Sequence, residues 1–457
     1  MNDVKQRPTD ITDPSSNAGD FEAFRPKDGA KAPTVMQVLP ALRNGGVERG
    51  TVDVARALVA AGWKAVVVSA GGPMVHELAR AGATHIELPI GAKNPLKWRS
   101  GFDRLVNLAF SHNVDLIHAR SRMPAWIAWR TAISRRVPFV TTFHGRYGDS
   151  NHVKKLYNSI MIKGDRVIAI SQFIAEEITR RYNVTAESLR VIPRGVDLTL
   201  HDPDKVSAER MVKLTNEWRL PDGVPVVMLP ARVTRWKGHE LLIDALARLK
   251  NDISLHCLMV GPFEDKERYK TGLESRIAKR GLSPNVHFVG HCNDMPAAYK
   301  LADVVVSASL DPEPFGRVII EAQAMGRPII ATDHGGAAES MVDGQTGWLV
   351  KPNDVEALAQ GIRTALTIPD VERARLSGNA IAHAREHFSR EDMCARTLAV
   401  YCELLGLSPG TYSDSSSPGG GSTVVDVTKA DDSMVGGADE DSLFGADGAN
   451  FLSPPRT

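Results

Sequence analysis

The sequence has few of the features that mark several large classes of protein. Its four cysteines, Cys257, Cys292, Cys394 and Cys402, show no CxxC spacing, so neither a zinc knuckle nor a disulfide framework is expected. No apolar run approaches the roughly 20 residues that a membrane-spanning helix needs. Residues 1–31 lack the apolar core of a secretory signal. These absences favour a cytoplasmic protein whose only contact with a membrane is peripheral.

The chain also lacks an excess of charge of either sign. Its 55 basic and 54 acidic residues give a formal net charge of +1, so no nucleic-acid partner is expected. The balance hides an asymmetry, because residues 411–457 carry eight acidic residues against Lys429 and Arg456. The rest of the chain is therefore mildly basic. Clusters such as Arg135-Arg136 and Lys154-Lys155 suit contact with an anionic inner membrane, or are simply solvated surface charge.

Length and hydrophobic pattern predict two α/β domains. A chain of 457 residues with 43% apolar content is too long for one comfortable core. Short β-branched runs alternate with helical patterns, which is typical of βαβ units and a parallel sheet covered on both sides. The rhythm breaks at a Pro- and Gly-containing stretch, LRVIPRGVDLTLHDPD, which we interpret as a hinge. Accordingly we expect a disordered leader over 1–32, domains over 33–203 and 204–388, and a disordered acidic Gly/Ser-rich tail over 408–457.

Parallel sheets bind ligands beyond the carboxyl ends of their strands, so the turns from strand to helix are expected to carry the functional residues. In the first such turn, Gly45 and Gly46 open a helix, where backbone N–H groups and the helix dipole favour an anion. The pair is not a GxGxxG fingerprint, and a simple tight turn is the alternative.

Later turns of the first domain carry side chains suited to an acceptor. Arg120 and Arg122 follow DLIHA, and both suit an anionic group, although a solvated surface pair is the alternative. His144 follows PFVTTF, where it could bind a sugar hydroxyl or serve only the structure. Arg146, two residues further on, joins the candidate acceptor residues.

The second domain offers two cations and two carboxylates. Arg232 and Lys237 follow VVMLP, where a cation pair can neutralise a diphosphate leaving group without a metal. Glu313 and Glu321 are separated by seven residues in DPEPFGRVIIEAQAMG. If a helix begins near Phe315, Glu321 lies within two turns of the helix mouth, where both carboxylates could accept vicinal hydroxyls. The alternative is an amphipathic helix with one solvated glutamate.

Taken together, these residues resemble the retaining family-4 glycosyltransferases, over nearly all of Pro33 to Leu407. The resemblance rests on Glu-x7-Glu with its FG core, the Arg/Lys pair in ARVTRWKG, the Gly-Gly-x-Glu turn and the HG after a strand. The phrases SRMPAW, TTFHGRYG and PEPFGRVIIEAQAMG are most similar to the bacterial lipopolysaccharide-core and polysaccharide branch. The segment EDMCARTLAVYCELLG resembles the family's last helix, which crosses back to the first domain at about 389–407.

The resemblance implies a GT-B fold of two facing Rossmann-like domains, with the acceptor on the first and a nucleotide diphosphate sugar on the second. It further implies a role for each site residue. Gly46 approaches the donor phosphates, and Arg232 and Lys237 hold the diphosphate. Glu313 and the N–H groups of Phe315 and Gly316 contact the donor sugar, Glu321 the ribose, and His144 the sugar near its 6-position, while loops at Gly261 and Gly290 lie near the base. Pro314 lacks a backbone donor where relatives have Gly or Ala.

The resemblance implies transfer of a hexose, with retention, to a saccharide or lipid-linked saccharide. A front-side step is expected, since no carboxylate of the first domain is placed as a nucleophile. No metal or cofactor is expected, because Asp202-Pro203-Asp204 spells DxD only within the hinge, where turn chemistry explains it. Two alternatives remain open. One is a nucleotide-sugar 2-epimerase of the same fold, and the other is a sugar-binding module without catalysis.

Overall fold

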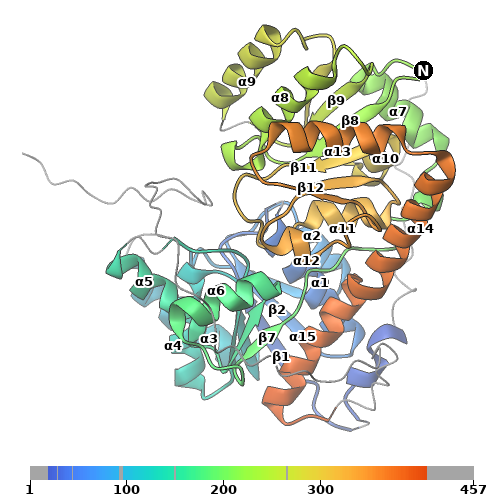
Figure 1. The fold of residues 1–457 in the computed structure, drawn as a ribbon. Helices are drawn as coiled ribbons and strands as arrows, with labels where there is room; N and C mark the ends of the chain where they lie inside the picture. The colour runs from blue at the N-terminus through green and yellow to red at the C-terminus, as the bar shows by residue number, and fades with distance from the viewer. Residues whose placement is uncertain are drawn as a thin grey trace, which may run out of the picture.

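The fold consists of two α/β domains, each built on a parallel sheet (Figure 1). The computed structural model describes residues 19–27, 29–43, 45–91, 96–148, 151–263 and 266–408. The first sheet has seven strands in the order β3-β2-β1-β4-β5-β6-β7, and the second has six in the order β10-β9-β8-β11-β12-β13. The strands are β1 (Thr34–Val38), β2 (Lys64–Ser69), β3 (Thr84–Glu87), β4 (Leu116–Ala119), β5 (Phe139–Phe143), β6 (Arg166–Ala169), β7 (Leu189–Val191), β8 (Val226–Pro230), β9 (His256–Val260), β10 (Val286–Gly290), β11 (Val304–Ser307), β12 (Ile329–Thr332) and β13 (Trp348–Val350).

Helices cover both faces of each sheet. Those of the first domain are α1 (Gly46–Ala60), α2 (Val75–Arg80), α3 (Leu96–Ser111), α4 (Arg122–Arg135), α5 (His152–Asn158) and α6 (Gln172–Tyr182). Those that follow are α7 (Ala208–Trp218), α8 (His239–Leu249), α9 (Glu267–Lys279), α10 (Met295–Leu301), α11 (Arg317–Ala324), α12 (Gly336–Glu339), α13 (Val355–Thr367), α14 (Asp370–His387) and α15 (Arg390–Leu405).

Burial on both faces explains why the strands are almost continuously apolar. Every residue of β1, β5 and β8 is buried, as parallel strands between two helical layers require. Each sheet therefore has one apolar cluster on either side. One cluster of the first domain also takes in Phe315 and Phe388, so the two domains share part of a core.

The strand order reverses in the middle of each sheet. β1 lies between β2 and β4 in the first sheet, and β8 lies between β9 and β11 in the second. At such a reversal the loops after the two neighbouring strands run to opposite faces, which opens a crevice at the carboxyl edge. The turns after β1 and β8 are therefore placed by topology to receive a ligand.

The N-terminal segment corrects one expectation. We expected residues 1–32 to be a disordered leader, but Gly19–Phe24 form a short 3-10 helix. Phe21 and Phe24 are each 5% exposed and belong to the core of the first domain. The indole Nε1 of Trp63 donates a hydrogen bond of 2.8 Å to the carbonyl of Phe24. Two buried phenylalanines thus anchor this segment to the first domain. The polar composition of the segment as a whole did not indicate this.

The end of the chain returns to the first domain. In Figure 1, α14 runs along the side of the molecule from the second domain, and α15 lies against the first. The helix expected at about 389–407 corresponds to α15, whose Leu398 and Tyr401 are fully buried in a first-domain core. The tail expected from 408 onward lies, apart from Ser408, outside the described residues.

Within the described residues the chain passes between the domains twice, and the two passages are joined by backbone hydrogen bonds. Val196 N–H donates to the carbonyl of Phe388 at 2.8 Å, and Arg390 N–H donates to the carbonyl of Val196 at 2.9 Å. Gly195 permits this contact, because a Cβ there would lie 2.5 Å from Arg390 Cα. The hinge is therefore a pair of strand-like segments and not two independent linkers.

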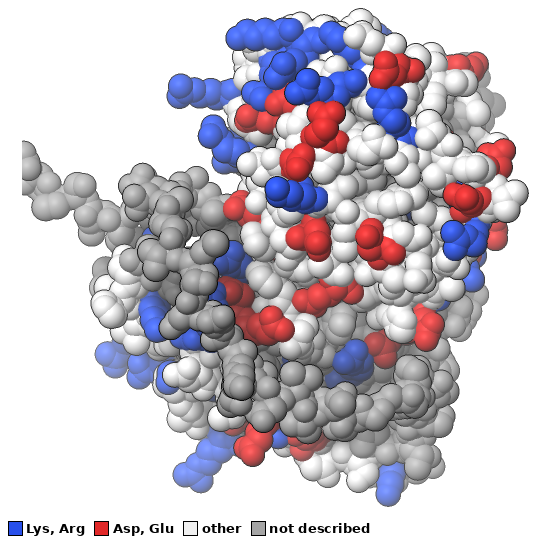
Figure 2. Space-filling view, viewed as in Figure 1, with Lys and Arg blue, Asp and Glu red and all other residues white. Residues whose placement is uncertain are grey.

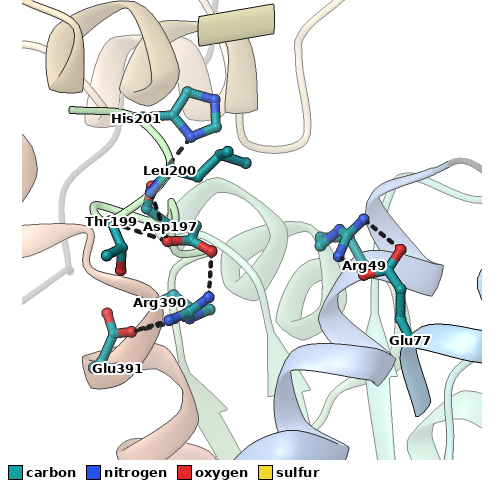
Figure 3. Close-up of polar contacts among 8 residues, drawn as sticks. All are labelled: Arg49, Glu77, Asp197, Thr199, Leu200, His201, Arg390 and Glu391. Atoms are coloured by element: carbon teal, nitrogen blue, oxygen red, sulfur yellow. Dashed lines mark hydrogen bonds and ion pairs between the residues drawn. The ribbon is translucent and has the colours of Figure 1, made fainter. Parts of the chain in front are cut away.

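An ion pair reinforces this hinge (Figure 3). The buried guanidinium of Arg390 pairs with Asp197 and, at 2.6 Å, with Glu391. The Asp197 carboxylate also accepts the N–H groups of Thr199 and Leu200, each at 3.0 Å. Burial opposes ionisation, but Arg390 and these N–H donors outweigh it and hold the pKa of Asp197 below its usual value.

A buried histidine ties α15 to the first sheet. His118 of β4 is fully buried, with Nδ1 2.6 Å from the Tyr401 hydroxyl and Nε2 2.7 Å from the Thr142 hydroxyl. Burial, together with the nearby charge of Arg120, lowers the pKa of His118 well below its usual value. The folded protein therefore holds this imidazole in its neutral form.

A dense group of basic side chains lies on the face of the molecule that Figure 2 shows. In Figure 2, Lys and Arg side chains gather at the end of the second domain where α8 and α9 lie. Acidic neighbours balance part of it, since Asp244 pairs with Arg276 at 2.5 Å and with Arg280 at 2.9 Å. Among the helices of the described residues, none is both long and apolar enough to cross a membrane.

Gly195→Ala tests the hinge contact. The added methyl group would collide with the backbone of Ser389 and Arg390, so we expect a loss of about 1–3 kcal/mol in the free energy of unfolding. Gly378→Ala in α14 is the control, because a Cβ there meets nothing within 4 Å and alanine favours a helix. Denaturant unfolding should show the first variant weaker and the second equal or stronger than wild type. Equal stability of Gly195→Ala would contradict the close packing of the two passages.

His118→Gln tests the neutral imidazole. Because the folded state lowers the pKa of His118, the unfolded state binds more protons once the pH falls below about 6.5, and stability is lost there. The free energy of unfolding of the wild type should thus fall between pH 7 and pH 5, and less steeply in the variant. The exposed His291, changed to Gln, is the matched control and should retain the wild-type slope.

Candidate active site

Turns from both domains meet in the gap between the two sheets. A Cβ added at Gly46, in the turn after β1, would lie 3.6 Å from Cδ of Arg317 in the second domain. A Cβ added at Gly145, after β5, would lie 3.6 Å from Cγ of Pro314. The Ser171 hydroxyl donates to the carbonyl of Pro314 at 2.6 Å. The turns predicted to bind acceptor and donor therefore face each other at contact distance.

The carboxylate of Glu48 lies over the first position of the Gly45–Gly46 turn. A Cβ at Gly45 would lie 2.4 Å from Oε2 of Glu48, which folds back over the start of α1. Beneath the turn, the guanidinium of Arg194 donates to the carbonyl of Gly46 at 2.5 Å. Gly50 leaves room for it, because a Cβ there would lie 2.1 Å from the Arg194 nitrogen. The start of α1 thus combines a helix N-terminus with a buried cation, which together favour an anion.

Lys237 and Glu313 form an ion pair at the centre of the site. Their side chains are 18% and 7% exposed, and the Ser309 hydroxyl also donates to the same oxygen of Glu313 at 2.5 Å. Gly238 (φ +73°) presses this turn against β11, since a Cβ there would lie 1.8 Å from the carbonyl oxygen of Ala308. The close backbone contact positions the turn, and the ion pair with Glu313 holds the lysine Nζ.

Arg232 lies on the opposite side of the gap from the start of α1. Its side chain is exposed, and its charge acts on Glu48 of the first domain. Burial raises the pKa of Glu48, and Arg232, Arg194 and Arg43 only partly offset that rise. Arg232 and the Gly45–Gly46 turn therefore face one region of space from two domains.

Helix α11 begins later than the sequence suggested. The condition considered was a start near Phe315; Gly316 adopts a left-handed conformation (φ +94°), and the helix starts two residues further on, at Arg317. Phe315 is 4% exposed and packs edge-on against Phe388, with ring centroids 5.8 Å apart. Its side chain is therefore structural, and only its backbone faces a ligand in the predicted role.

Glu321, on the first turns of α11, is held by two donors. The Tyr299 hydroxyl donates to Oε2 at 2.8 Å, and Arg317 donates to Oε1 at 2.8 Å. Arg317 also contacts the position of Gly46 across the gap, so the residues predicted for ribose and phosphate are adjacent. Tyr299 and Arg317 were not among the predicted site residues, although Arg317 directly follows the FG core.

His144 lies at the end of β5, partly buried, beside the loop that carries Glu313. Burial lowers its pKa well below the usual value, and the charges of Arg194 and Arg120 act in the same direction. Its Nε2 has no hydrogen-bond partner among the described residues. A neutral imidazole with an unsatisfied nitrogen suits a hydroxyl ligand, because buried polar atoms are normally paired.

The three arginines predicted for the acceptor lie in different surroundings. Arg120 is 3% exposed and donates through Nε to Gln37 at 3.0 Å, so it is a buried residue and not part of a solvated surface pair. Arg122 donates to Asn158 at 2.8 Å and lies 4.3 Å from the Tyr147 ring centroid. Arg146 pairs with Glu177 at 3.1 Å. Arg122 and Arg146 are only partly buried, and their acceptor role stays a prediction.

Gly261 and Gly290 are neighbours at the carboxyl edge of the second sheet. Gly261 N–H donates to the carbonyl of Gly290 at 2.8 Å. A Cβ at Gly261 (φ +159°) would lie 2.0 Å from the carbonyl oxygen of Ala231. These glycines therefore bring two loops together next to Arg232, and their contact with a base stays a prediction.

The DxD sequence Asp202-Pro203-Asp204 forms a turn at the start of a short helix. Asp202 accepts the N–H of Asp204 at 3.0 Å and caps a short 3-10 helix, Pro203–Lys205, as turn chemistry predicts. In the described part of the chain, no group of three or more His, Cys, Asp or Glu is arranged to hold a metal ion.

Glu339 of the second domain makes a contact with the first domain that the sequence did not predict. The carboxylate of Glu339, at the end of α12, accepts the N–H of Gln172 at 2.7 Å and also that of Phe173, both in the first turn of α6. A residue of the second domain thus caps a helix of the first. Nothing local in either segment reveals this pairing, because it depends on how the domains approach one another.

Comparison with known proteins agrees with this geometry. The model of the Glycosyltransferase Family 4 domain matches residues 44–200, and that of the Glycosyl transferases group 1 matches residues 213–383. A D-inositol 3-phosphate glycosyltransferase of Nocardia farcinica is 30% identical over 289 residues, which span 59% of this chain and 62% of the relative. The two matched regions correspond to the two sheet-bearing domains.

Solved structures share the whole arrangement. A glycosyltransferase from Rickettsia africae is 37% identical, with a TM-score of 0.77 over 82% of this chain and 99% of that one. Anabaena HepE in complex with UDP and glucose is 25% identical, with a TM-score of 0.72 over 81% and 99% of the two chains. The lipopolysaccharide glycosyltransferase WaaG, at 17% identity and a TM-score of 0.63, shares the fold. By these matches, the chain belongs to the GT-B glycosyltransferases that join a family 4 domain to a group 1 domain.

Proposed function

We propose that this protein is a retaining, metal-independent glycosyltransferase that moves a hexose from a nucleotide diphosphate sugar to a hydroxyl of a saccharide or lipid-linked saccharide. The observation that carries the proposal is the Lys237–Glu313 pair, held in the gap where Gly46 and His144 of the other domain also lie. Anabaena HepE has been solved with UDP-glucose, which supports a nucleotide sugar as donor.

In the proposed reaction the donor diphosphate lies between the start of α1 and the turn after β8. Lys237 and Arg232 would stabilise the charge that develops on the departing diphosphate, as cations directed at a developing negative charge do. The N-terminus of α1 adds its dipole, and Arg194 adds a charge directly beneath Gly46. These groups supply what a metal ion would otherwise provide.

The bond changes follow from this placement. The bond between the sugar C1 and the diphosphate oxygen breaks, and the acceptor oxygen bonds to C1 on the same face. The acceptor's proton passes to the departing phosphate oxygen. Glu313 and neutral His144 would hold the donor sugar through its hydroxyls, so the protein contributes orientation and charge stabilisation and no covalent intermediate.

For the acceptor, we propose a cell-surface saccharide, in lipopolysaccharide core or another polysaccharide, at the cytoplasmic face of the inner membrane. The phrases SRMPAW and TTFHGRYG support this branch. The surface of α5 supports peripheral contact, since Val153 and Leu156 are 76% and 67% exposed beside Lys154 and Lys155. Apolar and basic side chains together suit an anionic lipid surface.

The donor should be found by thermal-shift and calorimetric titration with UDP, GDP and ADP and their sugars, all in the presence of EDTA. A specific donor should raise the unfolding temperature, because a ligand that binds only the native state stabilises it. With an acceptor present, the sugar should be transferred with retention. Donor conversion to its C2 epimer without acceptor would identify an epimerase, and binding without turnover a non-catalytic module. Activity that is lost in EDTA and restored by Mn²⁺ would contradict metal independence.

Lys237→Ala tests the cation at the diphosphate. Its loss should lower kcat by roughly 10²–10³-fold, the scale observed when one electrostatic stabiliser of a transition state is removed. Lys213→Ala, an exposed lysine on α7, is the matched control and should leave kcat unchanged. Steady-state kinetics with the identified donor decides the matter. Unchanged turnover in Lys237→Ala would contradict the assignment.

A further inference from the structure

Tyr299 commits its hydroxyl to one carboxylate. It lies on α10, is fully buried and is among the largest side chains with no exposure. Its Oη donates to Oε2 of Glu321 at 2.8 Å. Burial, and next the negative charge of Glu321, raise the pKa of Tyr299 well above its usual value. The phenol therefore stays protonated and serves as a permanent donor to a charged acceptor.

The other oxygen of Glu321 has its own donor. Arg317, one turn earlier on α11, donates to Oε1 at 2.8 Å. With both oxygens held, the carboxylate plane is set by α10 on one side and α11 on the other. Each oxygen of a carboxylate can accept about two hydrogen bonds, so each retains a free position. The Glu321 side chain is 14% exposed, so a ligand in the gap meets this carboxylate and not the buried phenol.

We propose that Tyr299 is a positioning residue that fixes the Glu321 carboxylate to accept both ribose hydroxyls of the donor nucleoside. The inference rests on the proposed function, which places the nucleotide at Glu321. It adds a source of specificity, since recognition of a vicinal diol needs both oxygens in one orientation. A glutamate side chain free to rotate would lose conformational entropy on binding, whereas one already held by Tyr299 loses little.

The tyrosine ring is itself held by the hinge. His201, 7% exposed, packs against it with ring centroids 6.1 Å apart. His201 Nδ1 lies 3.1 Å from the carbonyl oxygen of Asp197, the residue that pairs with Arg390 (Figure 3). A continuous set of contacts therefore runs from the paired passages between the domains to the carboxylate at the ribose position.

A purely structural role, in which the hydrogen bond only fastens α10 to α11, makes a different prediction. In that case removal of the hydroxyl lowers stability and weakens all nucleotides alike. A positioning role instead changes the preference for nucleotides that carry both ribose hydroxyls over those that lack one. The ratio of the two affinities separates the roles, because a uniform loss of folded protein cancels in it.

The experiment uses Tyr299→Phe in the full chain, which keeps the ring and removes only the hydroxyl. Calorimetry would measure the Kd of the nucleoside diphosphate that the wild type prefers among UDP, GDP and ADP, and of its 2′-deoxy and 3′-deoxy forms. We expect the ribose form to bind about 5- to 20-fold more weakly in the variant, the scale of a charge-assisted hydrogen bond. The deoxy forms should change by less than about 2-fold, so that the preference falls.

Tyr401→Phe is the matched control. Tyr401 is also fully buried, and its hydroxyl is 2.6 Å from His118, in the core of the other domain. This variant should lower the unfolding temperature and keep the wild-type preference for ribose. In the double variant Tyr299→Phe/Glu321→Gln, the preference for the ribose form over the deoxy forms should equal that of Glu321→Gln alone. The two changes are not additive because both act through the same carboxylate.

The outcomes separate this inference from the proposed function. A wild type that binds none of the nucleoside diphosphates would overturn the proposed function. A wild type that prefers ribose, with the same preference retained in Tyr299→Phe, would overturn only the positioning role. An equal fall of the preference in Tyr401→Phe would also overturn it, because the effect would then follow from any lost buried hydroxyl.

Discussion

The site depends on the pairing of the two passages that join the domains. Because Val196 hydrogen-bonds to both Phe388 and Arg390, the two hinge segments are held against each other. The residues of the site come from both domains: Gly46 and His144 from the first, and Lys237 and Glu313 from the second. No single domain contains a complete site. The hydrogen bonds of the hinge thus set the register in which the two halves of the site face each other.

Several arginines lie close together beside the gap, and their mutual repulsion opposes folding. Burial first, then the neighbouring Arg317 and Arg120, lower the pKa of Arg194 to about 9, and buried Asp53 offsets only part of this. Grouping like charges in a poorly solvated place costs stability. The same group favours an anion such as a diphosphate, so part of the stability of the ligand-free protein is given up for binding. Perturbed groups of this kind concentrate at functional sites.

Much of the fold followed from the alternation of β-branched runs with helical patterns, because a parallel sheet buried on both faces requires it. Lys237, Glu313 and Glu321 could be selected from the sequence because they follow strands and carry charged side chains. Local sequence patterns missed the N-terminal segment. The polar residues before Pro33 concealed Phe21 and Phe24, which are buried in the core of the first domain.

Other site residues could not be found from sequence for a physical reason. Arg194 matters because Gly50 leaves space for it, and Tyr299 matters because α10 lies beside α11. Such pairings join residues far apart in the chain and follow no period of a helix or strand. Arg120 shows the converse error, since its place at a strand end suggested exposure, whereas Gln37 holds it inside. A position at the carboxyl edge of the sheet thus does not ensure that a side chain is exposed to a ligand.

The cap that Glu339 places on α6 ties the hydrogen bonding of two backbone amides to the contact between the domains. As long as the domains are together, the amide hydrogens of Gln172 and Phe173 are bonded to a carboxylate from the other domain. Once the domains part, these amides, in the first turn of a helix, have no intrahelical carbonyl to bond and face water. Hydrogen exchange at these two sites would therefore report the opening of the gap in solution, with no label and no change to the sequence.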